Sequence, residues 1–239
     1  MTAGISEHYR QLEAGEVSGL AAKYADAWKD PLLPWRQHSL VVARELERFR
    51  HGEPIKPYAV LLECLKTLPV ELNRPTARLL DVGASTGYYS EVLRLSGWQC
   101  DYTALDYSQS YKDAAEALFP SIHFEVGDAR ELPFDSDSFD IVLHGACIMH
   151  CADYERAIDE AQRVARKFII FHRTPVSEVN PTVFYEKLAY GIPCIEACFS
   201  ETELIALFRS RGLQFWARRD VFFNAETRTG HRSYVLRKS

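Results

Sequence analysis

Residues 78–90, RLLDVGASTGYYS, are the stretch that decides the fold. An apolar run ends in the acid Asp81 and a glycine turn, and a helical pattern begins at Tyr88. This order predicts a first β-strand, a ligand-binding loop and a helix. Gly83 and Gly87 allow the backbone to turn tightly and approach a ligand, and the free N–H groups that begin the helix would face the same ligand. The stretch alone therefore predicts a site for a nucleotide-like molecule.

The composition is typical of one folded domain with a large core. The chain has 239 residues, of which 47% are hydrophobic and 26% charged, and its net charge is −5. An acidic chain lacks the basic footprint of a nucleic-acid binder, so nucleic acid is disfavoured as a partner. No apolar run approaches the ~20 residues that a membrane helix needs, and the N-terminus has no apolar signal core. We therefore expect a cytoplasmic protein that does not use a membrane.

Two cysteine pairs share the same spacing, Cys147 with Cys151 and Cys194 with Cys198. Four thiolates would suit a structural zinc ion. Three intervening residues in both pairs, one of them in the most buried part of the expected fold, are more simply explained by ordinary thiols. We expect free cysteines and no metal.

The chain order predicts a helical segment followed by an alternating one. Helices are expected at 1–30, 37–50 and 58–68, and we interpret residues 1–70 as a cap or gate on a domain that covers 71–239. A purely structural lid is the alternative. Strands are expected at 78–82, 101–105, 123–126, 139–143 and 167–172, and helices at 88–96, 110–119, 153–165 and 200–211. This alternation predicts an α/β fold, with a doubly wound parallel sheet and helices on both faces.

The last part of the chain departs from that alternation. Residues 174–200 are less regular, and we expect them to form an insertion over the ligand edge of the sheet. The chain closes with two strands, 214–223 and 233–237, separated by a polar turn that contains glycine. An antiparallel pair on an otherwise parallel sheet fits this ending.

Two acids follow strands at the expected ligand edge of the sheet. Asp106 ends the second strand, nineteen residues beyond Gly87, where an acid is placed to accept hydrogen bonds from ribose hydroxyls. A turn cap is the alternative reading of Asp106. Asp128 follows the third strand and can accept from an adenine amino group, while the small Ala129 leaves room for a flat base.

Taken together, LLDVGASTG, ALDYS, GDARELPF and FDIVLHGACIMH resemble the class I S-adenosylmethionine-dependent methyltransferases, most closely the small-molecule members with type 11 or type 25 domains. The resemblance covers residues 76–175 by motif and 55–239 by strand order. It implies a Rossmann-like sheet of seven strands in the order 3-2-1-4-5-7-6, with the last strand antiparallel. It also implies S-adenosylmethionine as the cofactor.

The same resemblance implies which residues bind the cofactor. They are Asp81, Gly83, Ala84, Ser85 and Gly87 in the loop, Asp106 and Tyr107, Asp128 and Ala129, and His144 and Gly145. Ser85 stands where a glycine is usual, and we predict a tolerated substitution that adds a hydroxyl near the methionine part. A dehydrogenase is the rival for such a loop, but no third glycine falls in the register of its fingerprint.

Three histidines lie near strand ends and are candidate bases. Methyl transfer mainly requires alignment of nucleophile, methyl and sulfur, and a hydroxyl acceptor gains from a base that works near neutral pH. His144 and His150 follow the fourth strand and His172 ends the fifth. We favour His144 or His150, while each of the three could instead only hydrogen-bond the local fold.

The acceptor is expected between residues 1–70 and the insertion. Arg173 could hold a carboxylate or phosphate, and Trp35, Tyr185 and Tyr190 could form an aromatic wall. Local ion pairing and plain packing are the alternatives. We expect methyl transfer to a small molecule, at an oxygen nucleophile. A methyltransferase acting on RNA or protein, and a non-catalytic S-adenosylmethionine-binding protein, remain as alternatives, and a homodimer is compatible with the sequence.

Overall fold

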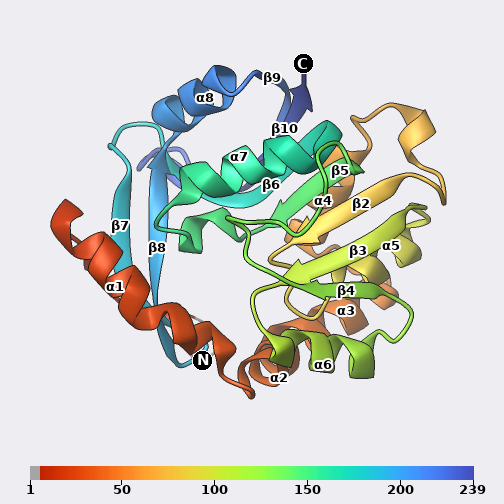
Figure 1. The fold of residues 1–239 in the computed structure, drawn as a ribbon, viewed down its shortest axis with the longest axis horizontal. Coiled ribbons are helices and arrows are strands. Elements are labelled where there is room, and N and C mark those ends of the chain that lie inside the picture. The colour runs from red at the N-terminus through yellow and green to blue at the C-terminus, as the bar shows by residue number, and fades with distance from the viewer. Residues whose placement is uncertain (1–5) are drawn as a thin grey trace.

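A mixed sheet of ten strands runs through residues 6–239, the part of the chain that this computed structural model describes (Figure 1). The strands are β1 (Ser6–Gln11), β2 (Arg78–Val82), β3 (Asp101–Asp106), β4 (His123–Val126), β5 (Phe139–Gly145), β6 (Ala165–Ser177), β7 (Val183–Ala189), β8 (Ile192–Ser200), β9 (Leu213–Asn224) and β10 (Thr229–Lys238). The helices are α1 (Val17–Tyr24), α2 (Leu33–Gln37), α3 (Ala43–Arg50), α4 (Lys56–Leu65), α5 (Tyr89–Ser96), α6 (Gln109–Leu118), α7 (Tyr154–Val164) and α8 (Glu201–Ser210). A π turn, His38–Val42, joins α2 to α3.

The predicted α/β class and the mostly parallel main sheet are confirmed. Strands β4, β3, β2, β5 and β6 pair in that order and run parallel. Strand β10 then pairs antiparallel with both β6 and β9. The carboxyl ends of β2, β3, β4 and β5 therefore meet at one edge, where open α/β sheets bind ligands.

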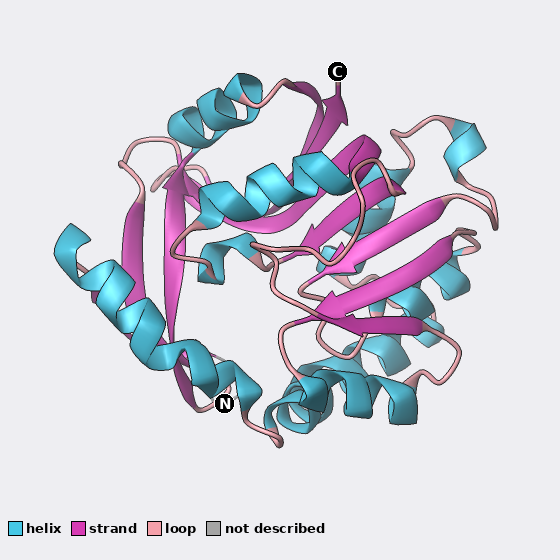
Figure 2. Cartoon of the chain, in the orientation of Figure 1, coloured by secondary structure: helices cyan, strands magenta, loops and turns pink. Residues whose placement is uncertain are grey.

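The prediction of a seven-stranded sheet is wrong in its strand count, and the order of the whole sheet differs. Strands β1, β7 and β8 continue the sheet beyond β6. Strand β8 joins β6 through only two residue pairs, Val176 with Phe199 and Ser177 with Ser200. In Figure 2, β7 and β8 stand to the left of the main sheet, and α1 lies across β8.

Two local predictions are also wrong. Residues 174–200 are not irregular, because β6 continues to Ser177 and a regular β7–β8 hairpin follows. Prolines and a glycine interrupt the apolar pattern there and hide the strands. Residues 1–30 are not helical throughout, because Ser6–Gln11 forms β1. Its polar sequence has no strand pattern of its own, and it is a strand only because it pairs with β7. Residues 1–5 of the predicted helix lie outside the described part.

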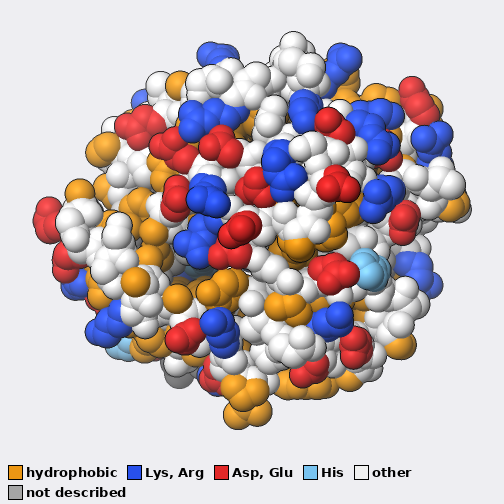
Figure 3. Space-filling view, viewed as in Figure 1, with side chains coloured by type: hydrophobic (Ala, Val, Ile, Leu, Met, Phe, Trp, Pro, Cys, Tyr) orange, Lys and Arg blue, Asp and Glu red, His pale blue; other side chains and the backbone are white. Residues whose placement is uncertain are grey.

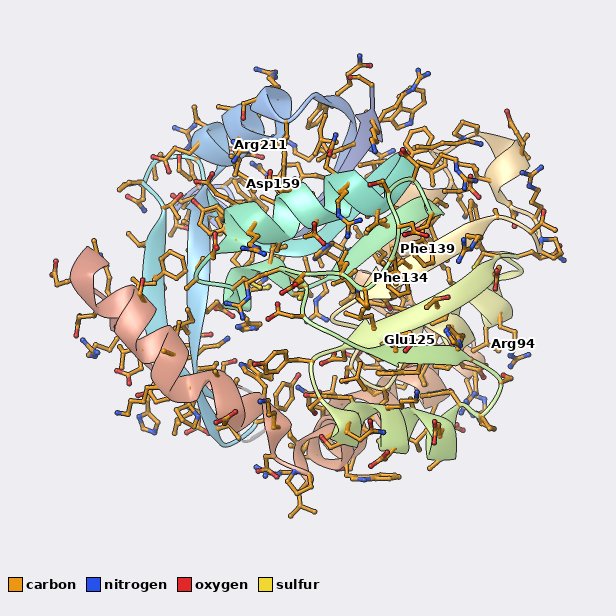
Figure 4. The ribbon with its side chains drawn as sticks, in the orientation of Figure 1. Arg94, Glu125, Phe134, Phe139, Asp159 and Arg211 are labelled. Carbon is orange, nitrogen blue, oxygen red and sulfur yellow. The ribbon has the colours of Figure 1, made fainter. Side chains whose placement is uncertain are left out.

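Helices cover both faces of the main sheet, as the buried strand β2 requires. One face packs against α7 and α8, through residues such as Ile158 and Phe208. The other packs against α3, α4 and α5, through residues such as Leu61 and Val92. The first face is also tied at its surface, where Arg211 Nε donates to Asp159 Oδ1 at 2.9 Å (Figure 4).

The surface in Figure 3 mixes basic and acidic side chains without a broad field of one sign. None of the helices in residues 6–239 is long and apolar enough to span a bilayer.

Candidate active site

A cavity of about 1040 Å³ lies between the carboxyl ends of the parallel strands and the β7–β8 hairpin. Ligand pockets usually measure about 300–1,000 Å³, so this one has room for a cofactor and an acceptor together. Its wall draws on the glycine loop, the segments after β3, β4 and β5, helix α1 and the hairpin. The predicted residues on the wall are Gly83, Ala84, Ser85, Asp106, Tyr107, Asp128, Ala129, Gly145, His150, Arg173 and Tyr190.

The glycine loop takes left-handed backbone angles at three positions. Gly83 has φ of 71° and Gly87 has φ of 75°, a region that costs glycine nothing. A Cβ built on Gly83 would lie 2.5 Å from Cys147 Cβ, so no larger residue fits. Ser85 shares this conformation, with φ of 55°, which explains why glycine is usual there.

The Ser85 side chain is tied to the N-terminal helices. Its hydroxyl donates to Gln37 Oε1 at 2.9 Å, and the Tyr111 hydroxyl donates to the same oxygen at 3.0 Å. Gln37 ends α2 and itself lines the cavity. The extra hydroxyl of the unusual serine therefore fastens the loop to the segment before the main sheet.

Asp106 is held by backbone donors and keeps accepting capacity toward the cavity. Its Oδ2 accepts the Ser85 N–H and its Oδ1 accepts the Tyr107 N–H, both at 2.7 Å. Each carboxylate oxygen has a further lone pair, so a diol in the cavity could be bound by both oxygens. Burial raises the pKa of Asp106 to about 6, against the opposing effect of the two N–H bonds.

Asp128 is already occupied by a neighbouring arginine. Arg130 donates to it through its side chain, with Nη2 2.6 Å from Oδ2, and through its backbone N–H at 2.8 Å. Burial alone would raise the pKa of Asp128, but the Arg130 bonds hold it below its usual value. Asp128 and the small Ala129 both line the cavity, with Asp128 ionised at neutral pH.

Strand β5 presents alternate residues to opposite sides, and this separates the predicted pair His144 and Gly145. Gly145 faces the cavity, and a Cβ built on it would lie 2.8 Å from the Tyr89 ring. His144 is buried away from the cavity with no hydrogen-bond partner for either ring nitrogen in the described residues, and burial lowers its pKa to about 3. Its ring lies 5.1 Å from that of Phe171.

His150 combines access to the cavity with a fixed ring. Its Nδ1 donates to the Ile195 carbonyl oxygen at 2.8 Å, which leaves Nε2 unprotonated in the neutral ring. The ring lies 5.0 Å from that of Trp28, and both residues line the cavity. Burial lowers the pKa of His150, so the neutral form is the one present at pH 7.

The structure does not bring every predicted residue to the cavity wall. Asp81 is buried behind Gly145, where it accepts from the Tyr102 hydroxyl at 2.6 Å and burial raises its pKa to about 7. The Nδ1 atom of His172 lies 2.8 Å from Ser233 Oγ in the interior. The remaining predicted residues off the wall are Gly87, Trp35, which is 44% exposed, and Tyr185, which packs on Tyr9.

Four residues on the wall hold left-handed backbone angles without being glycine. They are Ser85, Ala146, Arg173 and Tyr190, out of seven such residues in the described part of the chain. Conformations of this kind cost free energy and concentrate at functional sites. Their gathering on one wall supports the cavity as the place where the protein acts.

Several wall residues were missed by sequence reasoning. Tyr88 and Tyr89 line the cavity, and the tyrosine pair directly after the glycine loop could have signalled this. Lys187 and Glu196 form a buried ion pair between β7 and β8. No local pattern could have found that pair, because the hairpin itself was not predicted. The six cysteines are free, and residues 6–239 contain no group of three or more side chains placed to hold a metal ion.

Comparison with known proteins identifies the domain type. Residues 80–169 match the family model described as a methyltransferase domain. The demethylmenaquinone methyltransferase of Renibacterium salmoninarum is 29% identical over 150 residues, which cover 61% of this chain and 62% of the relative. The chain thus spans less than two thirds of that relative, and matched segments cover 21% and 36% of two others.

Solved structures share the fold over a longer range. The Burkholderia thailandensis 1,6-didemethyltoxoflavin-N1-methyltransferase, solved with S-adenosylhomocysteine bound, is 17% identical with a TM-score of 0.61 and covers 98% of this chain and 99% of its own. The [4+2]-cyclase SpnF is also 17% identical, with a TM-score of 0.56, and covers 76% of this chain and 80% of its own. These matches confirm the predicted Rossmann-like fold.

Proposed function

We propose that this chain is a class I S-adenosylmethionine-dependent methyltransferase and that it transfers a methyl group to an oxygen nucleophile of a small molecule. The observation that carries this proposal is a single cavity. Its wall includes most of the residues expected to bind the cofactor, and it also includes His150, whose Nε2 is unprotonated in the neutral ring. Asp106, residues of the glycine loop and His150 all line this cavity. Two relatives are named for the small molecules demethylmenaquinone and 1,6-didemethyltoxoflavin, which supports a small acceptor.

The donor set of the wall fits S-adenosylmethionine. Asp106 would accept from the ribose hydroxyls, and the loop Gly83–Ser85 would hold the methionine part. Ala129 gives room for the adenine ring, and Asp128 would orient it while clamped by Arg130. Gly145 would lie beside the sulfur, where a side chain has no space. The bound cofactor supplies an electrophilic methyl group on a positively charged sulfur.

His150 would act as the general base. Its Nδ1 proton is committed to the Ile195 carbonyl, so Nε2 would accept the hydroxyl proton of the acceptor as its oxygen takes the methyl group and the methyl–sulfur bond breaks, leaving a neutral thioether. The lowered pKa keeps this nitrogen free at neutral pH. His144 and His172 do not line the cavity, and we propose that they support the fold behind it.

The N-terminal segment and the hairpin would close the site together. Helix α1, the turn at Trp28 and the end of α2 line the cavity from one side, and β7–β8 lines it from another. Between them they would exclude water and fix the acceptor, which is the alignment that methyl transfer requires. The predicted cap over residues 1–70 therefore remains part of the proposal, together with strand β1.

A second function deserves a separate test because SpnF has this fold and is named for a cyclisation. The protein could hold S-adenosylmethionine without transferring its methyl group, since fold alone does not fix the reaction. An acceptor on RNA or protein is the other alternative, and a cavity lined by both the N-terminal segment and the hairpin favours a small molecule over a macromolecule.

Calorimetric titration with S-adenosylhomocysteine tests the cofactor site, with Asp106→Ala as the variant that should lose binding. A panel of phenols, catechols and aromatic carboxylates incubated with S-adenosylmethionine then tests transfer by mass spectrometry. A product heavier by one CH2 unit supports the proposal. Tight cofactor binding with no methylated product from any acceptor class would favour the non-catalytic alternative.

A further inference from the structure

Arg173 brings a permanent positive charge to the cavity without an acid to balance it. The residue lines the cavity, and within residues 6–239 its guanidinium forms no ion pair. Its polar neighbours are the hydroxyls of Tyr88, Tyr89 and Tyr190. A guanidinium stays charged at all pH values that proteins experience, so burial without a counter-charge is costly.

A bulge in β6 places this side chain. Along the β6–β10 pairing, Phe171 pairs with Tyr234 and Thr174 with Arg232, so two residues of β6, His172 and Arg173, lie opposite Ser233 alone. The φ of Arg173 is 59°, in the left-handed region. Bulges of this kind redirect a side chain and are common beside active sites. The fold therefore accepts backbone strain at the one position that turns Arg173 toward the cavity.

The other charges of the wall are already neutralised or lie elsewhere. Lys187 is paired with Glu196, and Arg130 is paired with Asp128. Asp106 accepts backbone N–H groups at the ribose position, and Glu45, a residue of α3, lines the cavity without an ion pair to Arg173 in the described residues. Near Arg173, the buried hydroxyl of Tyr89 has no hydrogen-bond partner in the described residues. Arg173 and the neighbouring hydroxyl thus offer the cavity hydrogen-bond donors and a positive charge that forms no ion pair within the described residues.

We propose that Arg173, with the Tyr89 hydroxyl, binds an anionic group of the methyl acceptor, a carboxylate or a phosphate. The planar fork of arginine matches both groups through two parallel hydrogen bonds. The inference rests on the proposed function and adds the acceptor's charge to it. The acceptor is an aromatic anion rather than a neutral phenol, because Tyr88, Tyr190 and Trp28 surround the same space.

The position of Arg173 favours the acceptor over the cofactor's own carboxylate. Arg173 lies in β6, whereas the glycine loop follows β2 and Asp106 ends β3. Strand β5 lies between β2 and β6, so at about 4.8 Å per strand Arg173 stands roughly 10 Å from the loop strand. The side of the cavity beyond Gly145 is where an acceptor must approach the methyl group.

The test uses benzoate, phenyl phosphate and the neutral isostere benzamide as probes of the full-length protein saturated with S-adenosylhomocysteine. Ligand-observed NMR titration should show that benzoate or phenyl phosphate binds at least tenfold more tightly than benzamide. Arg173→Gln should remove that preference and leave benzamide binding unchanged. Arg173→Lys should retain part of it, because the charge remains without the fork. Arg209→Gln, an exposed arginine on α8, is the control with the same change in net charge.

Three results would overturn the inference. Benzoate and phenyl phosphate binding no better than benzamide would show that no anion site exists. A preference that survives in Arg173→Gln would place the site elsewhere. A tenfold loss of S-adenosylhomocysteine affinity in Arg173→Gln, with the probes unaffected, would assign Arg173 to the cofactor carboxylate. Arg173→Gly, which suits the left-handed backbone, repeats the test if the glutamine variant folds poorly.

Failure of the proposed function is separable from these results. If the wild-type protein does not bind S-adenosylhomocysteine, the methyltransferase proposal fails, and the same three probes are then titrated into the free protein. Discrimination against benzamide there would still support an anion site at Arg173.

Discussion

Arg232 and Arg173 lie one residue apart across the same strand pair, and their surroundings are opposite. Arg232 pairs with Thr174, directly after Arg173, and is 3% exposed. It forms ion pairs with Glu201, with Asp220 through Nε at 2.8 Å, and with Glu178 at 2.7 Å. Arg173 has no ion pair within residues 6–239 and faces the cavity. An arginine thus has three ionic partners inside the fold at position 232 and none in the described residues at position 173.

This difference separates groups that hold the fold together from groups that await a ligand. A buried charge is tolerated while all of its ionic partners are present. Removal of one partner strongly lowers the free energy of unfolding, because the other charge is left buried and unpaired. A charge left facing a cavity contributes nothing to folding, so it is retained for what it binds. The same distinction applies to His144 and His150, and to Asp81 and Asp106, where one member of each pair is enclosed and the other lines the cavity.

The largest expected effect is on stability at Arg232. Arg232→Met would leave Glu201 buried without its main partner and should lower the free energy of unfolding by about 3–5 kcal/mol. Arg173→Met is the matched change on the paired strand. It removes a charge that has no ion pair, and it should change the free energy of unfolding by less than about 1 kcal/mol. Urea unfolding of both variants measures this. Equal losses would mean that Arg173 also belongs to the structural network.

The second effect is on turnover at the two histidines. His150→Gln should lower kcat by about 100-fold to 10,000-fold, the range of a lost general base, with S-adenosylhomocysteine affinity unchanged. In the wild type, kcat should stay level at pH 6.5, the ordinary histidine pKa, and fall only at more acidic pH, because burial lowers the pKa of His150. His144→Gln should affect stability and leave kcat and its pH profile in place.

One result would contradict this contrast between His144 and His150. A His144→Gln protein that folds normally and loses turnover as strongly as His150→Gln would show that the ring behind the wall takes part in the reaction. Both rates are measured with any acceptor that the mass-spectrometric screen finds.

The third effect is a pH dependence at Asp106. The ionised carboxylate is the form that accepts from a diol, and burial raises its pKa to about 6, so S-adenosylhomocysteine affinity should rise from pH 5 to pH 7. Asp106→Asn should weaken binding by about 10-fold to 100-fold, as expected for hydrogen bonds to a charged group, and remove the pH dependence.

The same pKa has the opposite consequence for the free protein. A carboxyl whose pKa is raised on folding binds more protons in the folded state, so its contribution to stability falls as pH rises from about 4 to about 6. Asp106→Asn should therefore stabilise the ligand-free protein at pH 8. A loss of stability there would show that the ionised carboxylate serves the fold as well as the cofactor.

The smallest effect is expected at Ser85. Ser85→Gly relieves a left-handed backbone and loses the bond to Gln37, so the free energy of unfolding should change by no more than about 1 kcal/mol. Ser85→Ala keeps the strain and loses the bond, so it should be the less stable variant by thermal melting. Both variants lose the hydroxyl, so the reverse order would mean that a side chain at this left-handed position costs little strain.

The main sheet could be predicted because each of its strands carries a local signal. Strand β2 is a buried apolar run ended by an acid and a glycine, and its predicted bounds, 78–82, are the observed ones. Strand β4, at 123–126, is likewise confirmed. The helix expected over 200–211 is α8, with the Glu203 N–H donating to Ser200 Oγ at its start. In these segments the sequence pattern and the tertiary environment agree.

The acceptor side could not be predicted because its structure depends on partners distant in sequence. Strand β1 exists only beside β7, and β7 carries the buried Lys187, which would be read as exposed without its partner Glu196. The side of β5 that His144 faces depends on register, because a shift by one residue reverses every side chain of a strand. The sequence order predicts that His144 lies at the end of a strand, but it does not predict that His144 and Gly145 face opposite sides of the sheet with only Gly145 toward the cavity.

The two-residue junction between β6 and β8 has a consequence for how new specificities could arise. Everything proposed to hold the cofactor belongs to the main sheet, whereas β1, β7 and β8 join it through Val176 and Ser177 alone along the strand pairing. Under the proposed function, the hairpin is therefore an exchangeable module. Replacing its residues would change which acceptor is methylated, while the residues proposed to hold the cofactor stay in place.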